Sequence, residues 1–457
     1  MEPSTKKRRY AHQSGENKPP RKKRGITKCD GGTTSPARPS DQWPKLDWSQ
    51  LPQSSAIEKI ISTGNWEYLR SEASRLYPST QQVPCSIDLT RLTSGRQNVV
   101  FEISFSDGTY WVARVSLTQD VEMQMLSEVA TINLLLEKKS IPVPSVLGFN
   151  CQNENPFGFP YMFMSALPGR TLDKTFALSV PEQHKPKVAG QLARYWYELS
   201  QVTFDQIGRI WGGPGADDDL RIISLPWFGA RDGEPGLYDI GPFKTSGAYF
   251  SGIRQGMNDL LRAQHRDAWP QWSGPCQALT EAIPSLTIAP RRRRGRFPLS
   301  HPDFHYGNVL VDDDYNVTGI IDWTNAHTVP VEVFAAWPEI MIPGSASNEV
   351  KAAIAQFRDL FTKALKNLES AAESGSTSLA ISGLLESSML TVVHRWLVAV
   401  GNVPHTLRAL SAYADMVLRA LYGDGATVEN YKSVRRNKQK CTNGGLGALG
   451  CRSPGTG

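Results

Sequence analysis

Apolar and polar residues alternate through residues 87–115, and two short turns interrupt the alternation. The turns fall at Ser94-Gly95 and at Ser106-Asp107-Gly108, and these residue types are typical of tight connections between strands. Runs that alternate with a period of two form strands with one buried face. The pattern therefore predicts three antiparallel strands, over residues 87–92, 99–105 and 110–115.

Most of the remaining chain carries apolar residues at helical spacing. Residues 120–138 predict one long helix, which ends before Pro142 because a residue that precedes proline avoids helical angles. Residues 212–245 are rich in Gly, Pro and Asp and are expected to form loops. Further helices are predicted within residues 43–77 and over residues 181–200, 247–266, 275–283, 350–371, 379–401 and 404–421.

Both ends of the chain are basic and poor in large apolar residues. Residues 1–45 carry twelve Lys/Arg and four Asp/Glu, and residues 425–457 carry six and one. Such segments bury too little apolar surface to become ordered, so both are expected to be disordered tails. The basic clusters at 6–9 and 21–24 fit a solvated tail and also the pattern of nuclear import signals. The expected location is cytoplasmic, with nuclear entry through this tail left open.

Several classes of protein are disfavoured by composition. The chain has no apolar run of about 18 residues and no apolar region near its N-terminus, so we expect neither a membrane span nor a secretory signal. Its six cysteines are scattered without metal-ligand spacing and are expected to be free thiols. Between the tails the chain is net negative, which argues against a nucleic-acid-binding surface. Oligomeric state is not indicated.

Residues 297–323 combine two short apolar runs with carboxylates. The runs at 309–311 and 319–321 predict a hairpin, joined by a turn at 312–316. Asp303 precedes Asn308 by five residues, and Asp322 ends the second strand. Carboxylate and amide oxygens suit Mg²⁺ with a polyphosphate, and a further carboxylate can orient the hydroxyl that attacks phosphorus. The stretch therefore predicts a phosphoryl-transfer site.

The order His301-Pro302-Asp303-Phe304-His305-Tyr306-Gly307-Asn308, followed by Ile320-Ile321-Asp322-Trp323, resembles the aminoglycoside phosphotransferase family, the small-molecule branch of the protein-kinase-like fold. The resemblance implies an α+β fold with two lobes: a mainly antiparallel N-terminal sheet over residues 46–165 and a mainly helical C-terminal lobe over residues 166–424. It also implies that ATP is the phosphate donor and a small-molecule hydroxyl the acceptor. Asp303 would then be the catalytic carboxylate, with Asn308 and Asp322 holding Mg²⁺.

The same resemblance assigns the nucleotide-binding residues. The turn that contains Gly95 would cover the phosphates, Arg114 on the third strand would contact them, and Glu128 on the long helix would pair with Arg114. Backbone groups from Ser165 to Leu167 would meet the adenine edge. Arg114 stands where kinases generally have lysine, and its planar fork prefers a different phosphate geometry.

Two other functions remain open. A catalytically weak kinase-like module that binds a nucleotide or a partner is favoured by Arg114 and disfavoured by the intact Asp303, Asn308 and Asp322. A protein kinase is disfavoured because no D-F-G or A-P-E segment follows the predicted catalytic loop. The identity of the acceptor is not given by the sequence. The arginines at 291–294 and the acidic run at 217–219 are expected to lie in exposed loops.

Overall fold

The computed structural model describes most of the chain between residues 38 and 443. The basic clusters at 6–9 and 21–24, the acidic run at 217–219 and the arginines at 291–294 lie outside the described residues. The described ranges are 38–44, 47–80, 82–119, 121–138, 140–212, 220–231, 233–286, 296–344, 346–372, 380–387, 390, 392–394 and 406–443.

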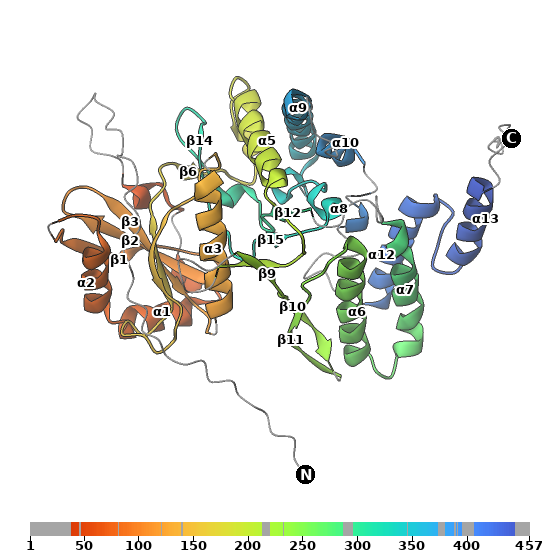
Figure 1. Ribbon diagram of the computed structural model, residues 1–457, viewed down its shortest axis with the longest axis horizontal. Helices are drawn as coiled ribbons and strands as arrows, with labels where there is room; N and C mark the ends of the chain where they lie inside the picture. The colour runs from red at the N-terminus through yellow and green to blue at the C-terminus, as the bar shows by residue number, and fades with distance from the viewer. Residues whose placement is uncertain are drawn as a thin grey trace, which may run out of the picture.

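The N-terminal part of the protein is built on a five-stranded antiparallel sheet, at the left of Figure 1. Its strand order is β1-β2-β3-β5-β4. The three strands predicted from alternation are confirmed as β1, β2 and β3, because their apolar positions do share one buried face. The strands are β1 (Cys85–Ser94), β2 (Asn98–Phe105), β3 (Tyr110–Ser116), β4 (Val146–Asn150) and β5 (Tyr161–Ser165).

Helices cover both faces of this sheet. One face packs on α1 (Ser54–Thr63) and α2 (Trp66–Leu76) through a cluster that includes the buried ring of Phe101. The other face carries Arg114 and is covered in part by α3 (Glu122–Lys138). The far side of α3 contributes residues to the main core of the C-terminal part. The predicted long helix is therefore confirmed, and it lies between the two parts of the protein.

A short N-terminal segment is attached to the same sheet face as Arg114. Arg38 Nε and Nη2 lie 3.0 Å and 2.6 Å from Oε1 of Glu102, and the Ser40 backbone N–H donates to its Oε2 at 2.9 Å. Gln53 Nε2 donates to the carbonyl of Gly95 at 2.7 Å, at the far end of the β1–β2 hairpin. The expected disorder of residues 1–45 is therefore wrong for residues 38–42, because Glu102 is a buried carboxylate that requires these donors.

We predict that Glu102→Gln lowers the free energy of unfolding by about 1 kcal/mol at pH 7. Burial raises the pKa of the Glu102 carboxyl, but the hydrogen bonds from Ser40 and Arg38 outweigh burial and hold this pKa below its ordinary value. A lowered folded-state pKa stabilises the fold above the unfolded-state pKa, which is about 4.3 for Glu. That stabilisation is lost as the pH falls through the folded-state pKa.

Urea unfolding of wild type and Glu102→Gln between pH 3 and pH 7 tests this, with exposed Glu58 changed to Gln as the matched control. The gap between wild type and Glu102→Gln should close towards acid pH, while Glu58→Gln should behave as wild type. A gap that is constant with pH would contradict the prediction.

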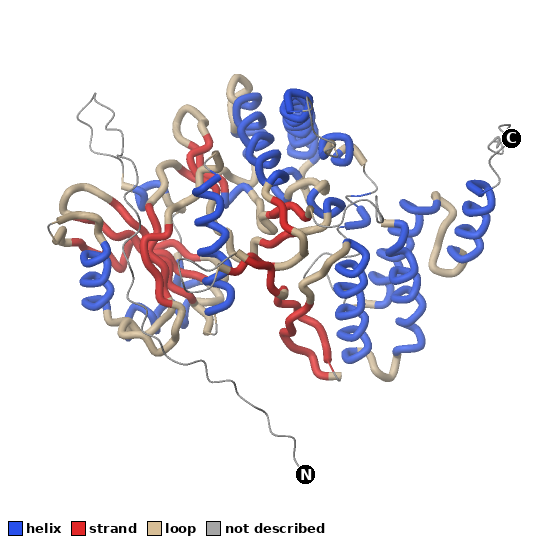
Figure 2. Tube along the Cα trace, in the orientation of Figure 1, coloured by secondary structure: helices blue, strands red, loops and turns tan. Residues whose placement is uncertain are grey.

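The C-terminal part is mainly helical, as Figure 2 shows by the blue segments that dominate it. Its main core packs α5 (Lys185–Gln201) against α9 (Asn348–Ala372), together with α4 (Phe176–Ser179) and α10 (Ile381–Leu385). A second core joins the helices α6 (Ser246–Gln264), α7 (Trp269–Ala282) and α12 (Leu407–Tyr422).

Short strands flank the loops that carry Asp303 and Asp322. The predicted hairpin is confirmed as β13 (Val309–Val311) and β14 (Val317–Ile320), and β13 also pairs with β6 (Arg170–Thr171). Gly169 precedes β6 with a φ of +106°, and a Cβ there would lie 2.6 Å from the Val311 carbonyl oxygen. Glycine is therefore required where the chain from β5 crosses the hairpin.

A second short-stranded sheet lies beside this hairpin and supports the loop that follows residue 300. Its order is β7-β12-β15-β8-β9. The strands are β7 (Thr203–Phe204), β8 (Arg209–Trp211), β9 (Arg221–Ile223), β12 (Phe297–Ser300) and β15 (His327–Thr328).

Two segments differ from the sequence prediction. Residues 212–245, expected as loops, contain β9 and the hairpin of β10 (Leu225–Arg231) and β11 (Glu234–Ile240), because buried Trp227 packs on α6. Residues 425–457, expected to be disordered, contain α13 (Tyr431–Asn443), because buried Tyr431 packs against Leu418. The predicted helix over 379–401 lies partly outside the described residues, and its described part begins with α10.

Among the described helices, none has the length and apolar composition that a membrane crossing requires.

Candidate active site

The loop between β12 and β13 begins at a buried histidine. His301 lies at the end of β12 and is 2% exposed. Its Nε2 lies 3.0 Å from the carbonyl oxygen of Ile321, so the ring donates from Nε2 to that carbonyl. Burial lowers the pKa of the His301 imidazole, which keeps the ring neutral near pH 7. His301 therefore ties the start of the loop to the residue that precedes Asp322.

Asp303 is the half-exposed carboxylate of this loop. The Asn308 side-chain Nδ2 donates to the Asp303 backbone carbonyl at 2.9 Å, which fixes the curve of the loop. His305 Nε2 lies 3.6 Å from Asp303 Oδ2. The neighbouring His305 imidazole outweighs the opposing effect of burial and lowers the pKa of the Asp303 carboxyl. Asp303 is therefore ionised near pH 7 and can accept a hydrogen bond from a hydroxyl group.

Asp322 follows β14 and has a left-handed backbone, with a φ of 60°. The preceding residue is held by a hydrogen bond from the Ile321 N–H to the Asn308 carbonyl at 3.0 Å. A non-glycine residue in this region costs about 1–2 kcal/mol, and such residues cluster at functional sites. Asp322 Oδ1 is buried and has no hydrogen-bond partner among the described residues. It lies 3.9 Å from Arg114 Nη1.

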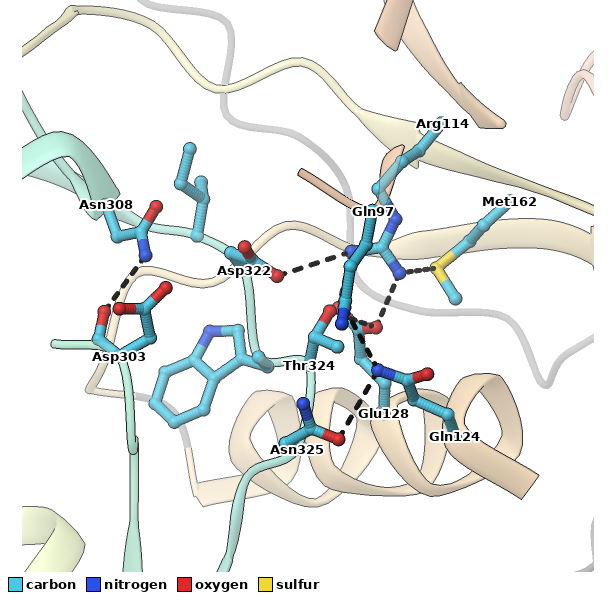
Figure 3. A network of polar contacts seen from close by, with 12 residues as sticks. Gln97, Arg114, Gln124, Glu128, Met162, Asp303, Asn308, Asp322, Thr324 and Asn325 are labelled. Atoms are coloured by element: carbon cyan, nitrogen blue, oxygen red, sulfur yellow. Dashed lines mark hydrogen bonds and ion pairs between the residues drawn. The ribbon is translucent and has the colours of Figure 1, made fainter. Parts of the chain in front are cut away.

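Arg114 on β3 and Glu128 on α3 form a buried, bidentate ion pair (Figure 3). Arg114 Nη1 donates to Glu128 Oε1 at 2.7 Å, and Nη2 donates to Oε2. Burial by itself lowers the pKa of the Arg114 guanidinium, but the charge and hydrogen bonds of Glu128, together with the charge of Asp322, raise this pKa above its ordinary value. The pairing expected from the sequence therefore exists in the structure, and it joins the sheet to α3.

Polar residues that the sequence analysis did not single out complete this network. Thr324 Oγ1 donates to Glu128 Oε2 at 3.0 Å. Gln124 Nε2 lies 3.3 Å from Asn325 Oδ1 and 3.3 Å from Gln97 Oε1. Gln124 precedes Glu128 by one helical turn and so shares its face of α3, which is a signal that the sequence contains. The roles of Thr324 and Asn325 depend on a turn geometry that the sequence does not reveal.

The site fits a hard cation. Among the described residues, no group of three or more His, Cys, Asp and Glu could hold a metal ion by itself. Mg²⁺ needs less, because it keeps several waters and takes one or two protein carboxylates together with phosphate oxygens. Among the described residues Asp322 Oδ1 has no hydrogen-bond partner, and the Asn308 amide bonds to the Asp303 carbonyl through its nitrogen rather than its oxygen. These two residues, predicted as magnesium ligands, could therefore hold the ion.

The other predicted nucleotide-binding residues lie around the same region. Gly95 lies in the β1–β2 turn; a Cβ there would meet no atom within 4 Å, so no contact in the structure requires glycine at this position. The Ser165 N–H donates to the Ser145 carbonyl at 2.9 Å, so this N–H is not free to bind adenine. The Leu167 side chain packs against Gly319 on β14, because a Cβ added at Gly319 would come within 2.7 Å of it.

We predict that Glu128→Ala lowers the free energy of unfolding by about 3 kcal/mol, because it leaves Arg114 buried without its main partner. Thr324→Val, which removes only one hydrogen bond to the same carboxylate, should cost about 1 kcal/mol. Chemical denaturation of the two variants and wild type measures both. Equal losses in the two variants would show that the ion pair does not support the fold.

Comparison with known proteins identifies relatives of this chain. A sequence model of the phosphotransferase enzyme family (APH) matches residues 88–332. Altered inheritance of mitochondria protein 9 of Candida dubliniensis is 23% identical over 194 residues, which cover 40% of this chain and 30% of that protein. A subtelomeric hrmA-associated cluster protein of Aspergillus fumigatus is 26% identical over 126 residues, which cover 27% of this chain and 25% of that protein. The matches thus span less than a third of either curated relative.

The chain also resembles solved structures. One is the ADP-bound aminoglycoside phosphotransferase APH(2'')-Ib, at 12% identity and a TM-score of 0.46, covering 78% of this chain and 98% of that chain. Another is a thermostable mutant of aminoglycoside phosphotransferase APH(4)-Ia in a ternary complex with AMP-PNP and hygromycin B. It is 16% identical with a TM-score of 0.41, covering 78% of this chain and 99% of that chain.

Proposed function

Because the chain belongs to the phosphotransferase enzyme family, we propose that it transfers the γ-phosphate of ATP to a hydroxyl group of a small molecule. The observation that carries the proposal is the grouping of Asp303, Asn308 and Asp322 beside the Arg114–Glu128 ion pair (Figure 3). Phosphoryl transfer needs positioning and charge neutralisation more than covalent chemistry from the protein. This group of residues offers both.

The nucleotide phosphates would lie between the β1–β2 turn and the turn that follows Asp322. Arg114 would neutralise part of their charge, and its fixed orientation against Glu128 means that little rearrangement is needed on binding. Asn308 and Asp322 would hold Mg²⁺. When bound, that ion supplies positive charge to the phosphates.

Asp303 would act on the acceptor. As an ionised carboxylate it can accept a hydrogen bond from the acceptor hydroxyl, orient its oxygen in line with the γ-phosphorus, and take its proton. A bond then forms between the acceptor oxygen and the γ-phosphorus, and the bond from that phosphorus to the bridging oxygen of ADP breaks. The proton remains on Asp303 until it passes to water.

Calorimetric titration of ATP, with and without Mg²⁺, tests the nucleotide half of this proposal. Wild type should bind ATP only in the presence of Mg²⁺, and Asp322→Ala should weaken that binding at least tenfold, a loss of about 1.4 kcal/mol. Asp303→Ala should keep the affinity, because Asp303 faces the acceptor, and should abolish phosphate transfer in a screen of hydroxyl compounds. Equal affinity in wild type and Asp322→Ala would overturn the assignment of Asp322.

One observation favours a second function, a kinase-like module that binds a nucleotide or a partner without transferring phosphate. Arg114 commits one N–H of each terminal nitrogen to Glu128. Its remaining N–H groups lie in the fixed plane of the guanidinium, whereas a lysine ammonium is compact and can rotate its donors towards phosphate. Arg114→Lys separates the two functions. Tighter Mg²⁺-dependent ATP binding with no phosphate transfer in wild type or variant would favour the binding module.

A further inference from the structure

Two residues of α3, one helical turn apart, contact the residues that follow Asp322. Glu128 accepts a hydrogen bond from Thr324 at 3.0 Å, and Gln124, one turn earlier, reaches the Asn325 side chain at 3.3 Å. The part of the chain that carries Asp322 is thus held against α3 at two adjacent points (Figure 3).

The Gln124 amide also reaches a third segment. Its Nε2 lies 3.3 Å from Oε1 of Gln97, in the turn between β1 and β2. The Gln97 backbone is itself fixed, because its carbonyl accepts a hydrogen bond from the Leu117 N–H at 2.8 Å, just beyond β3. One side-chain amide therefore bridges the β1–β2 turn, α3 and the turn after Asp322.

The turn that this amide reaches has an unusual backbone. Asp322 and Asn325 have φ values of 60° and 62°, so two of four consecutive residues are left-handed. Such conformations persist only where surrounding contacts enforce them. The hydrogen bonds of this turn include the Ala326 N–H to the Trp323 carbonyl at 3.0 Å, the Trp323 indole N–H to the Ile320 carbonyl at 3.0 Å, and His327 Nδ1 to the Asn325 carbonyl at 2.7 Å. The side-chain contacts of Thr324 and Asn325 with α3 add to these restraints and connect the turn to the helix.

We propose that Gln124 is a positioning residue for phosphoryl transfer. Its amide holds the β1–β2 turn and the turn after Asp322 in one arrangement, so that the two sides of the phosphate-binding region approach each other in a fixed geometry. The inference rests on the proposed function only where it concerns the nucleotide. The bridge itself is a property of the protein.

The first test uses Gln124→Met, which keeps the length of the side chain and its helix propensity but removes the amide. Met123, the neighbouring residue, is 43% exposed, and Met123→Gln is the matched control. Hydrogen exchange followed by mass spectrometry should show faster exchange in residues 95–98 and 322–326 together in Gln124→Met and in neither segment in Met123→Gln. Faster exchange in one segment only, or in neither, would overturn the bridge.

The second test measures Mg²⁺·ATP affinity by calorimetry. Gln124→Met should bind about tenfold more weakly than wild type, and Met123→Gln should bind as wild type does. Asn325→Gly keeps a residue that readily adopts the left-handed backbone but removes the amide, so it should weaken binding to a similar extent. The double variant Gln124→Met/Asn325→Gly should bind no more weakly than Gln124→Met alone, because Gln124→Met already removes the contact with Asn325 along with the contact with Gln97.

Additive losses in the double variant, or an Asn325→Gly variant with wild-type affinity, would overturn the coupling. If wild type itself bound no nucleotide, the proposed function would fail, while the exchange experiment would still decide whether the bridge exists. The two failures are therefore distinguishable.

Discussion

The buried ion pair between Arg114 and Glu128 is the interaction on which the candidate site depends. A guanidinium and a carboxylate removed from water are tolerated only when each satisfies the other in good geometry. The pair therefore fixes the distance and rotation of α3 against β3. The same carboxylate accepts a hydrogen bond from Thr324, and the same guanidinium faces Asp322. The pair thus places the N-terminal sheet relative to the C-terminal loops.

The second constraint is the backbone of the C-terminal loops. The Ile321 carbonyl accepts a hydrogen bond from the His301 ring, and the Ile321 N–H donates to the Asn308 carbonyl. These two hydrogen bonds connect the end of the hairpin to the loop that precedes it. Asp322 therefore follows a well-anchored strand, and among the described residues its buried Oδ1 has no hydrogen-bond partner, although it lies 3.9 Å from Arg114 Nη1. An unsatisfied carboxylate oxygen beside a fixed guanidinium suits a cation and a polyphosphate better than it suits the stability of the protein alone.

The N-terminal clasp, residues 38–44 and 47–53, adds a restraint outside the matched family region. It bonds to Glu102 in the middle of β2 and to the carbonyl of Gly95 at the turn. The hairpin proposed to cover the nucleotide is therefore held along its length by a segment that precedes it in the chain. A hairpin by itself is marginally stable, and the clasp together with α1 and α2 supports it.

The sequence by itself determined the strands of the N-terminal sheet, the long helix α3 and the hairpin at residues 309–320. Each of these elements has a periodic pattern of apolar residues within its own segment. It also indicated Asp303, Asn308 and Asp322, since their spacing is short. Sequence patterns did not indicate the strands of residues 221–240, the ordered residues 38–42 or helix α13, because each is stabilised by packing or charge from distant residues. Only the tertiary structure brought Gln97, Gln124 and Asn325 together, and only it placed Asp322 in a left-handed conformation. Contacts between residues about 200 positions apart, such as Gln124 with Asn325, leave no local pattern.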